Sequence, residues 1–340
     1  MTSLPVIRPV ATSDLPELLA LAQSSGYGLT TLPPDEEILE KRITASLQAF
    51  SQIVPEPSGQ SYLFVLERSG SLLGTCGIAS KTGGFHPFYA YQIEKEPFTS
   101  PSLQVDHEVE VLTLYAEHNG PGEIGSLLLS KEGRGTGLGG LLSRSRFLFV
   151  AEHPSFFEET IVAELRGVVD EEGKSPFWDA IAAHFFTVDY PRADQEVLRG
   201  KEFIADLIPR HPIYVPMLPQ EAQQVIGKVH PHTRPAQRML QQEGFAANGL
   251  VDLFEAGPVM ECARDEIRTV KHSHRANVHV VQDAALLDTP AWIGTTTMDF
   301  RCCEDHISLP TEGTNIDISA EAAEALQVTT NTPVRYCLKP

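Results

Sequence analysis

A glycine-rich segment with one arginine carries the residue types that bind a phosphate. It runs from Arg134 to Gly140 and reads RGTGLGG, with Gly135, Gly137 and Gly139 at alternate positions. Glycine lets the backbone approach an anion closely and adopt a positive φ. The amide groups that open a helix lack partners, and a guanidinium can bind two phosphate oxygens at once. The segment therefore predicts a pyrophosphate site at a helix N-terminus.

The flanking sequence predicts the elements that hold this segment. Ile124 to Leu129 is an apolar run of strand length, and Leu141 to Glu152 has the apolar content of a helix. The turn between them fits R-x-x-G-x-G, the loop of coenzyme A–dependent N-acyltransferases of the GNAT superfamily. It also fits the dinucleotide fingerprint G-x-G-x-x-G. More than a hundred residues precede it, whereas a dinucleotide fold places its fingerprint after the first strand, so coenzyme A is favoured. An NAD(P)-dependent oxidoreductase using Gly135–Gly140 is the remote alternative. The other alternative is a glycine-rich turn that has only a structural role and binds no ligand.

Composition excludes several function classes. The chain has 340 residues and a formal net charge of -19, which argues against nonspecific binding to nucleic acid or to anionic membranes. Any anionic cofactor then needs a locally basic site, and we expect Lys131, Arg134, Arg144 and Arg146 to form it.

Cysteine usage and hydropathy predict a cytoplasmic protein. The five cysteines are an odd number and include no C-x-x-C pair, so we expect reduced thiols and no metal site. The chain lacks a charged N-terminal region followed by an apolar run, and it lacks an apolar stretch of the ~20 residues that span a bilayer. We expect neither a signal peptide nor a membrane span.

The remaining patterns predict an α/β (α+β) fold. Ahead of the glycine-rich segment they give the order β-α-α-β-β-β-β, with Asp35 capping a helix from Glu36 to about Phe50. A strand from Thr160 to Arg166 and a helix from Arg234 to Glu243 follow it. Segments become short after Gly257, which predicts an acyltransferase part over residues 1–257 and a small β-rich domain over 258–340.

The chain resembles the arginine N-succinyltransferase family, with matches in order up to about residue 257. The matching segments are 6–10 (VIRPV), 28–33 (GLTTLP), 141–147 (LLSRSRF), 163–168 (AELRGV), 175–178 (SPFW), 209–214 (PRHPIY), 225–231 (VIGKVHP) and 251–254 (VDLF). The resemblance departs at Gly133, where the family has an aromatic residue before the loop arginine. It thins beyond residue 257.

The resemblance implies a GNAT-like fold, a mixed and mostly antiparallel sheet flanked by helices. It implies that succinyl-CoA donates its succinyl group to the α-amino group of L-arginine by direct attack on the thioester, the first step of arginine catabolism, without a metal. It also implies that Leu127 contacts succinyl-CoA and that His230 is the proton donor. The oligomeric state stays open between a homo-oligomer and a hetero-oligomer with a related subunit.

The sequence leaves the roles of several candidate residues undecided. Leu127 would act through its backbone amide, and His232 rivals His230 as the proton carrier. Glu164 and Arg166 face one side of a strand, where they either bind the substrate or form an ion pair within the sheet. Candidate cations for the succinyl carboxylate are Arg8, Arg144, Arg146, Arg166 and Arg210.

An unusually long segment separates the strand at Glu164 from the late helix. It covers residues 168–233, about 65 residues, far beyond a usual loop, and we expect this insert to build the amino-acid pocket. Two alternatives to arginine transfer remain: an N-acyltransferase for ornithine or another amino acid, and a coenzyme A–binding regulatory protein without turnover.

Overall fold

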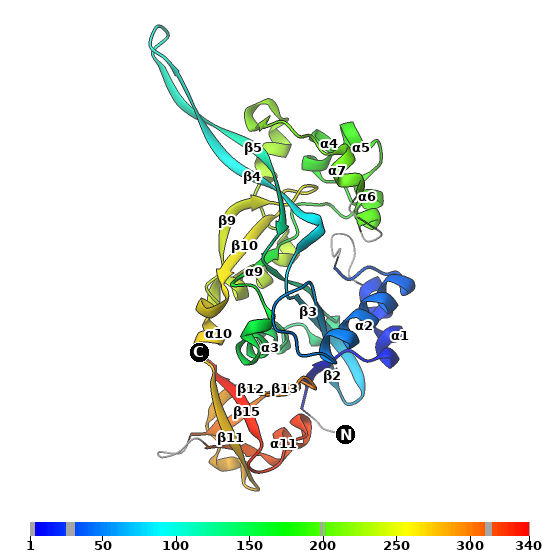
Figure 1. Cartoon of the computed structure of the whole chain (residues 1–340), viewed down its shortest axis with the longest axis vertical. Helices are drawn as coiled ribbons and strands as arrows, with labels where there is room; N and C mark the ends of the chain where they lie inside the picture. The colour runs from blue at the N-terminus through cyan, green and yellow to red at the C-terminus, as the bar shows by residue number, and fades with distance from the viewer. Residues whose placement is uncertain (1–3, 25–30, 198–199, 201, 310–314, 340) are drawn as a thin grey trace.

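The computed structural model describes residues 4–24, 31–197, 200, 202–309 and 315–339, and one sheet runs through it (Figure 1). In its first part the strand order is β1-β2-β3-β6-β7-β10-β9-β4-β5-β8, antiparallel throughout except for β6 beside β7. This confirms the predicted mixed, mostly antiparallel sheet. The strands are β1 (Val6–Pro9), β2 (Ser61–Arg68), β3 (Ser71–Ala79), β4 (Gly83–Ser100), β5 (Val105–Asn119), β6 (Gly122–Leu129), β7 (Thr160–Glu164), β8 (Ile213–Tyr214), β9 (Ala246–Val251) and β10 (Pro258–Ala263).

Helices flank this sheet and begin where the sequence supplies caps. The amide of Ile38 donates to the Asp35 carboxylate at 3.0 Å, and the amide of Trp178 donates to the Ser175 hydroxyl at 3.3 Å. The cap predicted at Asp35 is therefore confirmed. The helices are α1 (Leu15–Gln23), α2 (Glu36–Phe50), α3 (Leu138–Glu152), α4 (Pro176–Ala180), α5 (Ala183–Phe186), α6 (Tyr190–Val197), α7 (Glu202–Leu207), α8 (Gln220–Val225), α9 (Arg234–Gln242), α10 (Arg268–Lys271) and α11 (Ala320–Leu326).

Helix α3 is enclosed on all sides. Every residue from Leu141 to Glu152 is buried, because the helix packs against β3 of the sheet and also against strands of the C-terminal region. A helix covered all round does not need one polar face. The carboxylate of Glu152 is buried with it and accepts hydrogen bonds from Arg275 and Arg335 of that region.

The segment between β7 and α9 contains α4 to α8 and builds a core of its own. Trp178, Tyr190 and Phe254 pack there with Tyr91 of β4. Ser175 followed by Pro176 predicts a single helix through Phe186, but the helix is interrupted at Ile181, whose φ of -128° and ψ of -76° are not helical. The sequence also predicts a helix from Lys201 to Ile208, which α7 confirms over its described residues; residue 201 itself lies outside them.

The C-terminal region is a small β-rich unit, as the predicted fold class required. Its strands are β11 (His274–Val281), β12 (Thr289–Thr295), β13 (Cys302–Ser308), β14 (Asn315–Ser319) and β15 (Pro333–Leu338). They pair in the order β12-β15-β11-β14-β13, and β13 pairs with β12 again, so the strands close into a barrel. β13 also pairs with β1, which joins the barrel to the sheet.

We propose that the division between the two parts lies later than residue 257. β10 follows that position and pairs with β7 and with β9, so a boundary at Gly257 would separate neighbouring strands of one sheet. We therefore propose a division near Ser273, just before β11.

A long hairpin of β4 and β5 projects from the body of the molecule (Figure 1). Its outer part pairs Glu94 with Val111 and continues to Ser100 with Val105. Phe98 and Leu103 on this arm are exposed.

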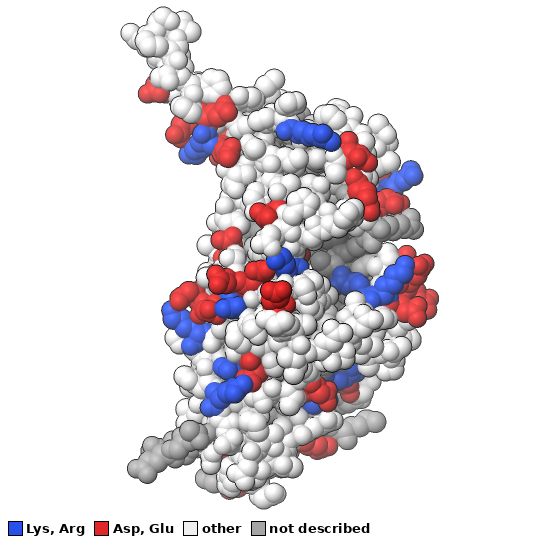
Figure 2. All heavy atoms as spheres, in the orientation of Figure 1, with Lys and Arg blue, Asp and Glu red and all other residues white. Residues whose placement is uncertain are grey.

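Both kinds of charged side chain lie on one face of the molecule (Figure 2). Figure 2 shows acidic and basic side chains interspersed on one face, which is hollowed between the part that carries α6 and the part that carries α2. No helix within the described ranges has the length and apolarity to cross a bilayer. All five cysteines are buried and free, which agrees with reduced thiols.

Candidate active site

The glycine-rich segment has the conformation that an anion site requires. Gly135 and Gly137 have φ of 76° and 87°, and a Cβ at either position would meet nothing within 4 Å. Glycine is therefore needed there for backbone conformation rather than for space. Gly137 is the N-cap of α3 and no side chain caps the helix, while Gly139 lies in the first turn. The amides at the start of α3 can thus bind a phosphate.

Arg134 is the exposed cation of this loop. Its Nε donates to the Leu129 carbonyl at 3.2 Å, which holds the side chain beside the end of β6. Gly133, where the family has an aromatic residue, is buried, and its amide donates to the Ser130 hydroxyl at 3.3 Å. A Cβ at Gly133 would come within 2.8 Å of the Leu129 side chain. The loop is thus anchored by Ser130 and Leu129 in place of an aromatic ring.

The predicted basic site is only half present. Lys131 and Arg134 are exposed, but Arg144 and Arg146 are buried, so their inclusion in that site was wrong. Arg144 forms an ion pair with Glu243 at 2.8 Å. Arg146 donates to the carbonyls of Gly77 and Gly125, and burial lowers the pKa of its guanidinium.

Strand β6 has separated from β7 and bulges against β3 where Leu127 lies. β6 and β7 pair only at Gly122–Ile161 and Glu123–Val162, so within the described chain Ile124 to Leu129 have no ladder to β7. On the other side, the register with β3 shifts between Thr75 and Gly77, and Ser126 has a φ of 52°. Leu127 is half-buried against the main core. Its backbone therefore lies in a bulge beside the widening between β6 and β7.

A cavity of about 230 Å³ lies next to this widening. Glu164 and Arg166 both line it, which places the two predicted substrate residues in one site. Within the matching segment 28–33, residues 28–30 lie outside the described residues, whereas Thr31 lines the cavity. The lining residues are Thr31, Arg42, Phe88, Tyr89, Glu123, Glu164, Leu165, Arg166, Tyr190, Asp194, Val197, Ile204, Asp252, Leu253, Phe254 and Glu255.

Two arginines give the cavity its positive groups. Arg42 donates from Nη2 to the Ser126 hydroxyl at 3.0 Å, beside Leu127. Burial lowers the pKa of Arg42, and the nearby Glu123 carboxylate opposes that effect. The Nε atoms of Arg42 and Arg166 are buried, and neither has a hydrogen-bond partner in the described part of the protein. A buried donor without a partner costs free energy, which a bound anion would offset.

Two acidic residues that line the cavity, Asp252 and Glu255, lie on one short segment. Glu255 is buried, and its two carboxylate oxygens accept from the Tyr190 hydroxyl at 2.6 Å and from the Gly167 amide at 2.8 Å. Burial raises the pKa of the Glu255 carboxyl to about 8, and the Asp252 charge adds to that rise.

His230 is held beside Arg166. Its amide donates to the Arg166 carbonyl at 2.9 Å, and its Nδ1 accepts from the His232 amide at 3.1 Å. That bond leaves the proton of the neutral ring on Nε2. Burial, then the Arg166 charge, lower the pKa of His230 below 6.5. His232 is exposed, so His230 fits a proton carrier better.

The other candidate cations lie elsewhere. Arg8 bonds to Asp14 at 2.7 Å and to Glu67 at 2.6 Å, and Arg210 is exposed and donates to the Ala205 carbonyl. Neither residue lines the cavity. The patterns missed Arg42, Tyr190 and Glu255. The sequence contains one weak signal for Arg42. This residue lies further along α2 than the acidic residues with which that helix begins.

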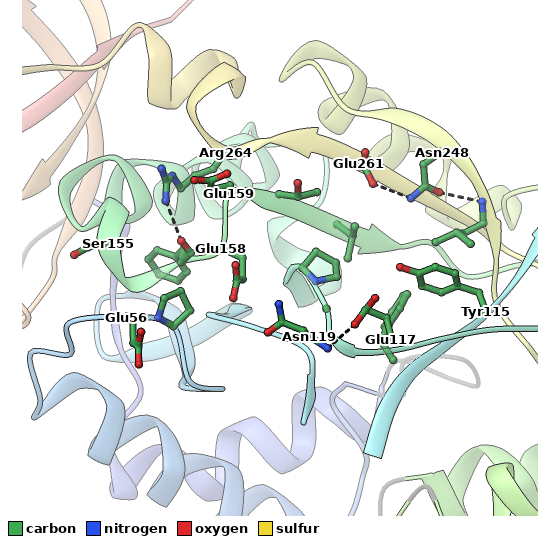
Figure 3. A pocket seen from close by; sticks show the side chains of 18 of the residues that line it. Glu56, Tyr115, Glu117, Asn119, Ser155, Glu158, Glu159, Asn248, Glu261 and Arg264 are labelled. Carbon is green, nitrogen blue, oxygen red and sulfur yellow. Dashed lines mark hydrogen bonds between the residues drawn. The ribbon is translucent and has the colours of Figure 1, made fainter. Parts of the chain in front are cut away.

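A larger cavity of about 650 Å³ lies over β7, β9 and β10 (Figure 3). None of the predicted site residues lines it. Arg264 there donates to the carbonyls of Pro154 and Phe157, and Asn248 donates to Glu261 at 3.0 Å. Arg264, Asn248 and Glu261 are thus bonded within the protein.

Comparison with known proteins shows the family to which the chain is similar. The family model described as arginine N-succinyltransferase beta subunit matches residues 5–269. Proteins named arginine N-succinyltransferase from Enterobacter sp. (strain 638) and from Escherichia coli O6:K15:H31 are each 43% identical over 282 residues, 82% of both chains.

A solved structure extends the likeness to the whole fold. It is the arginine/ornithine succinyltransferase subunit AI from Pseudomonas aeruginosa, which is 32% identical, covers 99% of each chain and has a TM-score of 0.89. The C-terminal barrel is thus part of the shared fold, and the GNAT-like fold class is confirmed. Acyl transfer replaces the dinucleotide alternative. The chain belongs to the arginine N-succinyltransferase family of acyltransferases.

Proposed function

We propose that the protein transfers the succinyl group of succinyl-CoA to the α-amino group of L-arginine, by direct attack of the amine on the thioester. The observation that carries this proposal is the cavity beside the widening of β6 and β7, which is lined by two arginines whose buried Nε atoms have no hydrogen-bond partner among the described residues. The two substrates together bring two carboxylates, one on the succinyl group and one on the amino acid.

The donor is held along β6 and α3. The diphosphate lies on the amides that open α3, with Arg134 and the glycines 135, 137 and 139 around it. The acyl chain then follows β6, where the Leu127 amide polarises the thioester carbonyl. Arg42 binds the succinyl carboxylate, because its bond to Ser126 places it next to Leu127.

The acceptor is held from β7 and the segment after it. Arg166 binds the α-carboxylate of the amino acid, and Glu164 attracts its α-ammonium group. The His230 amide donates to the Arg166 carbonyl and the Arg166 charge acts on the imidazole, so in this proposal the amine held by Arg166 reaches His230.

His230 moves the proton. Its depressed pKa keeps the ring neutral at pH 7, so it can accept a proton from the α-ammonium group. The neutral amine attacks the carbonyl carbon, the C–N bond forms and the C–S bond breaks. The imidazolium then returns a proton to the leaving thiolate, which gives coenzyme A and the succinylated amino acid.

Thiol release tests this function. Purified protein with succinyl-CoA is expected to release thiol only when an acceptor is added, and faster with L-arginine than with L-ornithine or L-lysine. Mass spectrometry would locate the succinyl group on the α-nitrogen. Release at equal rates with and without amino acid would contradict the proposal.

Assembly is part of the proposal. The matching family model describes a beta subunit and the Pseudomonas structure a subunit AI, so we propose that this chain assembles with itself or with a related chain. We also propose that it acts in the cytoplasm, which its free thiols favour. Sedimentation of the pure chain would show whether a second kind of subunit is required.

A further inference from the structure

The bulge in β6 depends on one residue in an unfavourable backbone conformation. Because the register with β3 shifts there, two residues of β6, Ser126 and Leu127, lie opposite Cys76 alone. Ser126 is buried and has a φ of 52°, in the left-handed region that residues other than glycine rarely adopt. A serine in that conformation costs free energy and persists only where its surroundings hold it.

Thr31 supplies most of the contacts that hold Ser126. The Ser126 amide donates to the Thr31 hydroxyl at 2.8 Å, and the Ser126 hydroxyl donates to the Thr31 carbonyl at 2.8 Å. The Ser126 hydroxyl also accepts from Arg42 at 3.0 Å. Thr31 packs closely on Gly125 as well, where a Cβ would come within 3.2 Å of the threonine methyl group. A residue that lies 95 positions earlier in the chain therefore shapes the bulge.

The backbone of Ser126 determines where the next amide points. Ser126 and Leu127 share one planar peptide group, so the φ and ψ of Ser126 set the direction of the Leu127 N–H. In the proposed function that N–H polarises the thioester carbonyl. A group that fixes Ser126 therefore also directs the donor of the hydrogen bond to the substrate.

We propose that Thr31 is a positioning residue for acyl transfer, whose hydroxyl holds Ser126 in the left-handed conformation and so directs the Leu127 amide at the thioester carbonyl. This inference rests on the proposed function, since it names what orients the donor in that same site. Thr31 also lines the cavity, and the alternative role is a direct contact with the acceptor amino acid. The two roles differ in their kinetics. A misdirected amide weakens binding of the transition state and barely affects binding of either substrate, so it lowers kcat and leaves KM.

Four side chains at position 31 isolate the hydroxyl. Threonine differs from valine, and serine from alanine, mainly by the oxygen that accepts from the Ser126 amide. We expect Thr31→Val and Thr31→Ala to lower kcat by about 30-fold, with KM for succinyl-CoA and for arginine within about threefold. Thr31→Ser restores the oxygen and should recover most of the rate. Because the serine and alanine pair makes the same comparison, the test does not depend on whether Thr31→Val folds.

A threonine near the other end of β6 provides the matched control. The Thr82 hydroxyl donates to the Pro121 carbonyl at 2.8 Å, just ahead of the strand, and Thr82 does not line the cavity. Thr82→Val removes a hydroxyl of the same kind and should leave kcat unchanged.

The stretching frequency of the thioester carbonyl gives a readout that a loss of stability would not change. Infrared spectra are recorded for bound succinyl-CoA with an isotope-labelled thioester carbonyl and without an amino acid. Binding to the wild type should lower the frequency, because a hydrogen bond from an amide polarises the carbonyl. We expect Thr31→Val and Thr31→Ala to reduce that shift by about half or more, and Thr31→Ser to restore it.

The outcomes separate this inference from the proposed function. A wild type that releases no thiol with arginine would refute the proposed function itself. With an active wild type, equal kcat and equal carbonyl frequency in Thr31→Ser and Thr31→Ala would overturn the positioning role. A rise in KM for arginine alone would overturn it too, since Thr31 would then be a contact of the acceptor.

Discussion

The guanidinium of Arg144 donates to the carboxylate of Glu243 at 2.8 Å, in the interior between α3 and the end of α9. Glu243 is fully buried and also accepts from the Thr269 amide at 2.8 Å. The ring of Trp292 in the barrel lies 4.8 Å from the Arg144 guanidinium carbon. One ion pair thus connects α3, α9, α10 and the barrel.

Removing one partner of this pair should be costly. Arg144→Met leaves the Glu243 carboxylate buried without its cation, and we expect a loss of about 3–5 kcal/mol in the free energy of unfolding. Urea denaturation followed by tryptophan fluorescence measures it. Asp265→Asn, which breaks the pair of an exposed carboxylate with Arg264, is the control and should cost less than about 1 kcal/mol. Equal losses in the two variants would contradict a structural role for Arg144.

The loop arginine should act on the diphosphate alone. Arg134→Ala is expected to raise KM for succinyl-CoA by about 10-fold to 30-fold, because an exposed charged contact to phosphate is lost. The rate with succinyl-pantetheine, a donor without the diphosphate, should not change. A loss with both donors would place Arg134 in another role.

The acyl chain is the part of the donor that Arg42 should recognise. Arg42→Gln is expected to lower kcat/KM for succinyl-CoA by about 100-fold and to leave butyryl-CoA, which lacks the carboxylate, within about threefold. Lys41→Gln is the matched control, because Lys41 is exposed and pairs with Glu37. If Arg42→Gln impaired both donors alike, the succinyl carboxylate would have another partner.

As the proton carrier, His230 should determine how kcat/KM falls on the acid side of its pH profile. Burial lowers the pKa of His230 below 6.5, so kcat/KM should fall about tenfold per unit only below that lowered pKa. His230→Gln should reduce turnover by about 100-fold and remove this limb, with little change in KM for succinyl-CoA. His232→Gln removes a neighbouring exposed ring and should keep both rate and limb. A limb retained in His230→Gln would assign the proton to another group.

Glu255 should make the stability of the fold depend on pH. Its pKa is raised to about 8 in the folded protein, above the ordinary 4.5, so the folded state holds the proton more tightly than the unfolded chain. The contribution to stability is fully present below pH 4.5 and is lost as pH rises to about 8, with a slope of about 1.4 kcal/mol per unit at most. Glu255→Gln should flatten this part of the curve of unfolding free energy against pH.

The sequence predicted those parts of the fold that depend on residues close together in the chain. The cap at Asp35, the glycine loop and the run of strands up to β6 follow from turn chemistry and periodicity. The burial of Arg144 and Arg146 could not be predicted, because it depends on a barrel formed by residues far along the chain. Arg42 and Glu255 meet in one cavity only after the sheet has formed, and no sequence spacing relates them.

The pairing of Val6 with Cys303 has a consequence for synthesis. A ribosome releases β1 long before β13, so the nascent chain carries an unpaired sheet edge until its last strands emerge. A truncated product that ends before residue 302 keeps that edge open and uncovers α3, and it should aggregate rather than persist as a minimal enzyme.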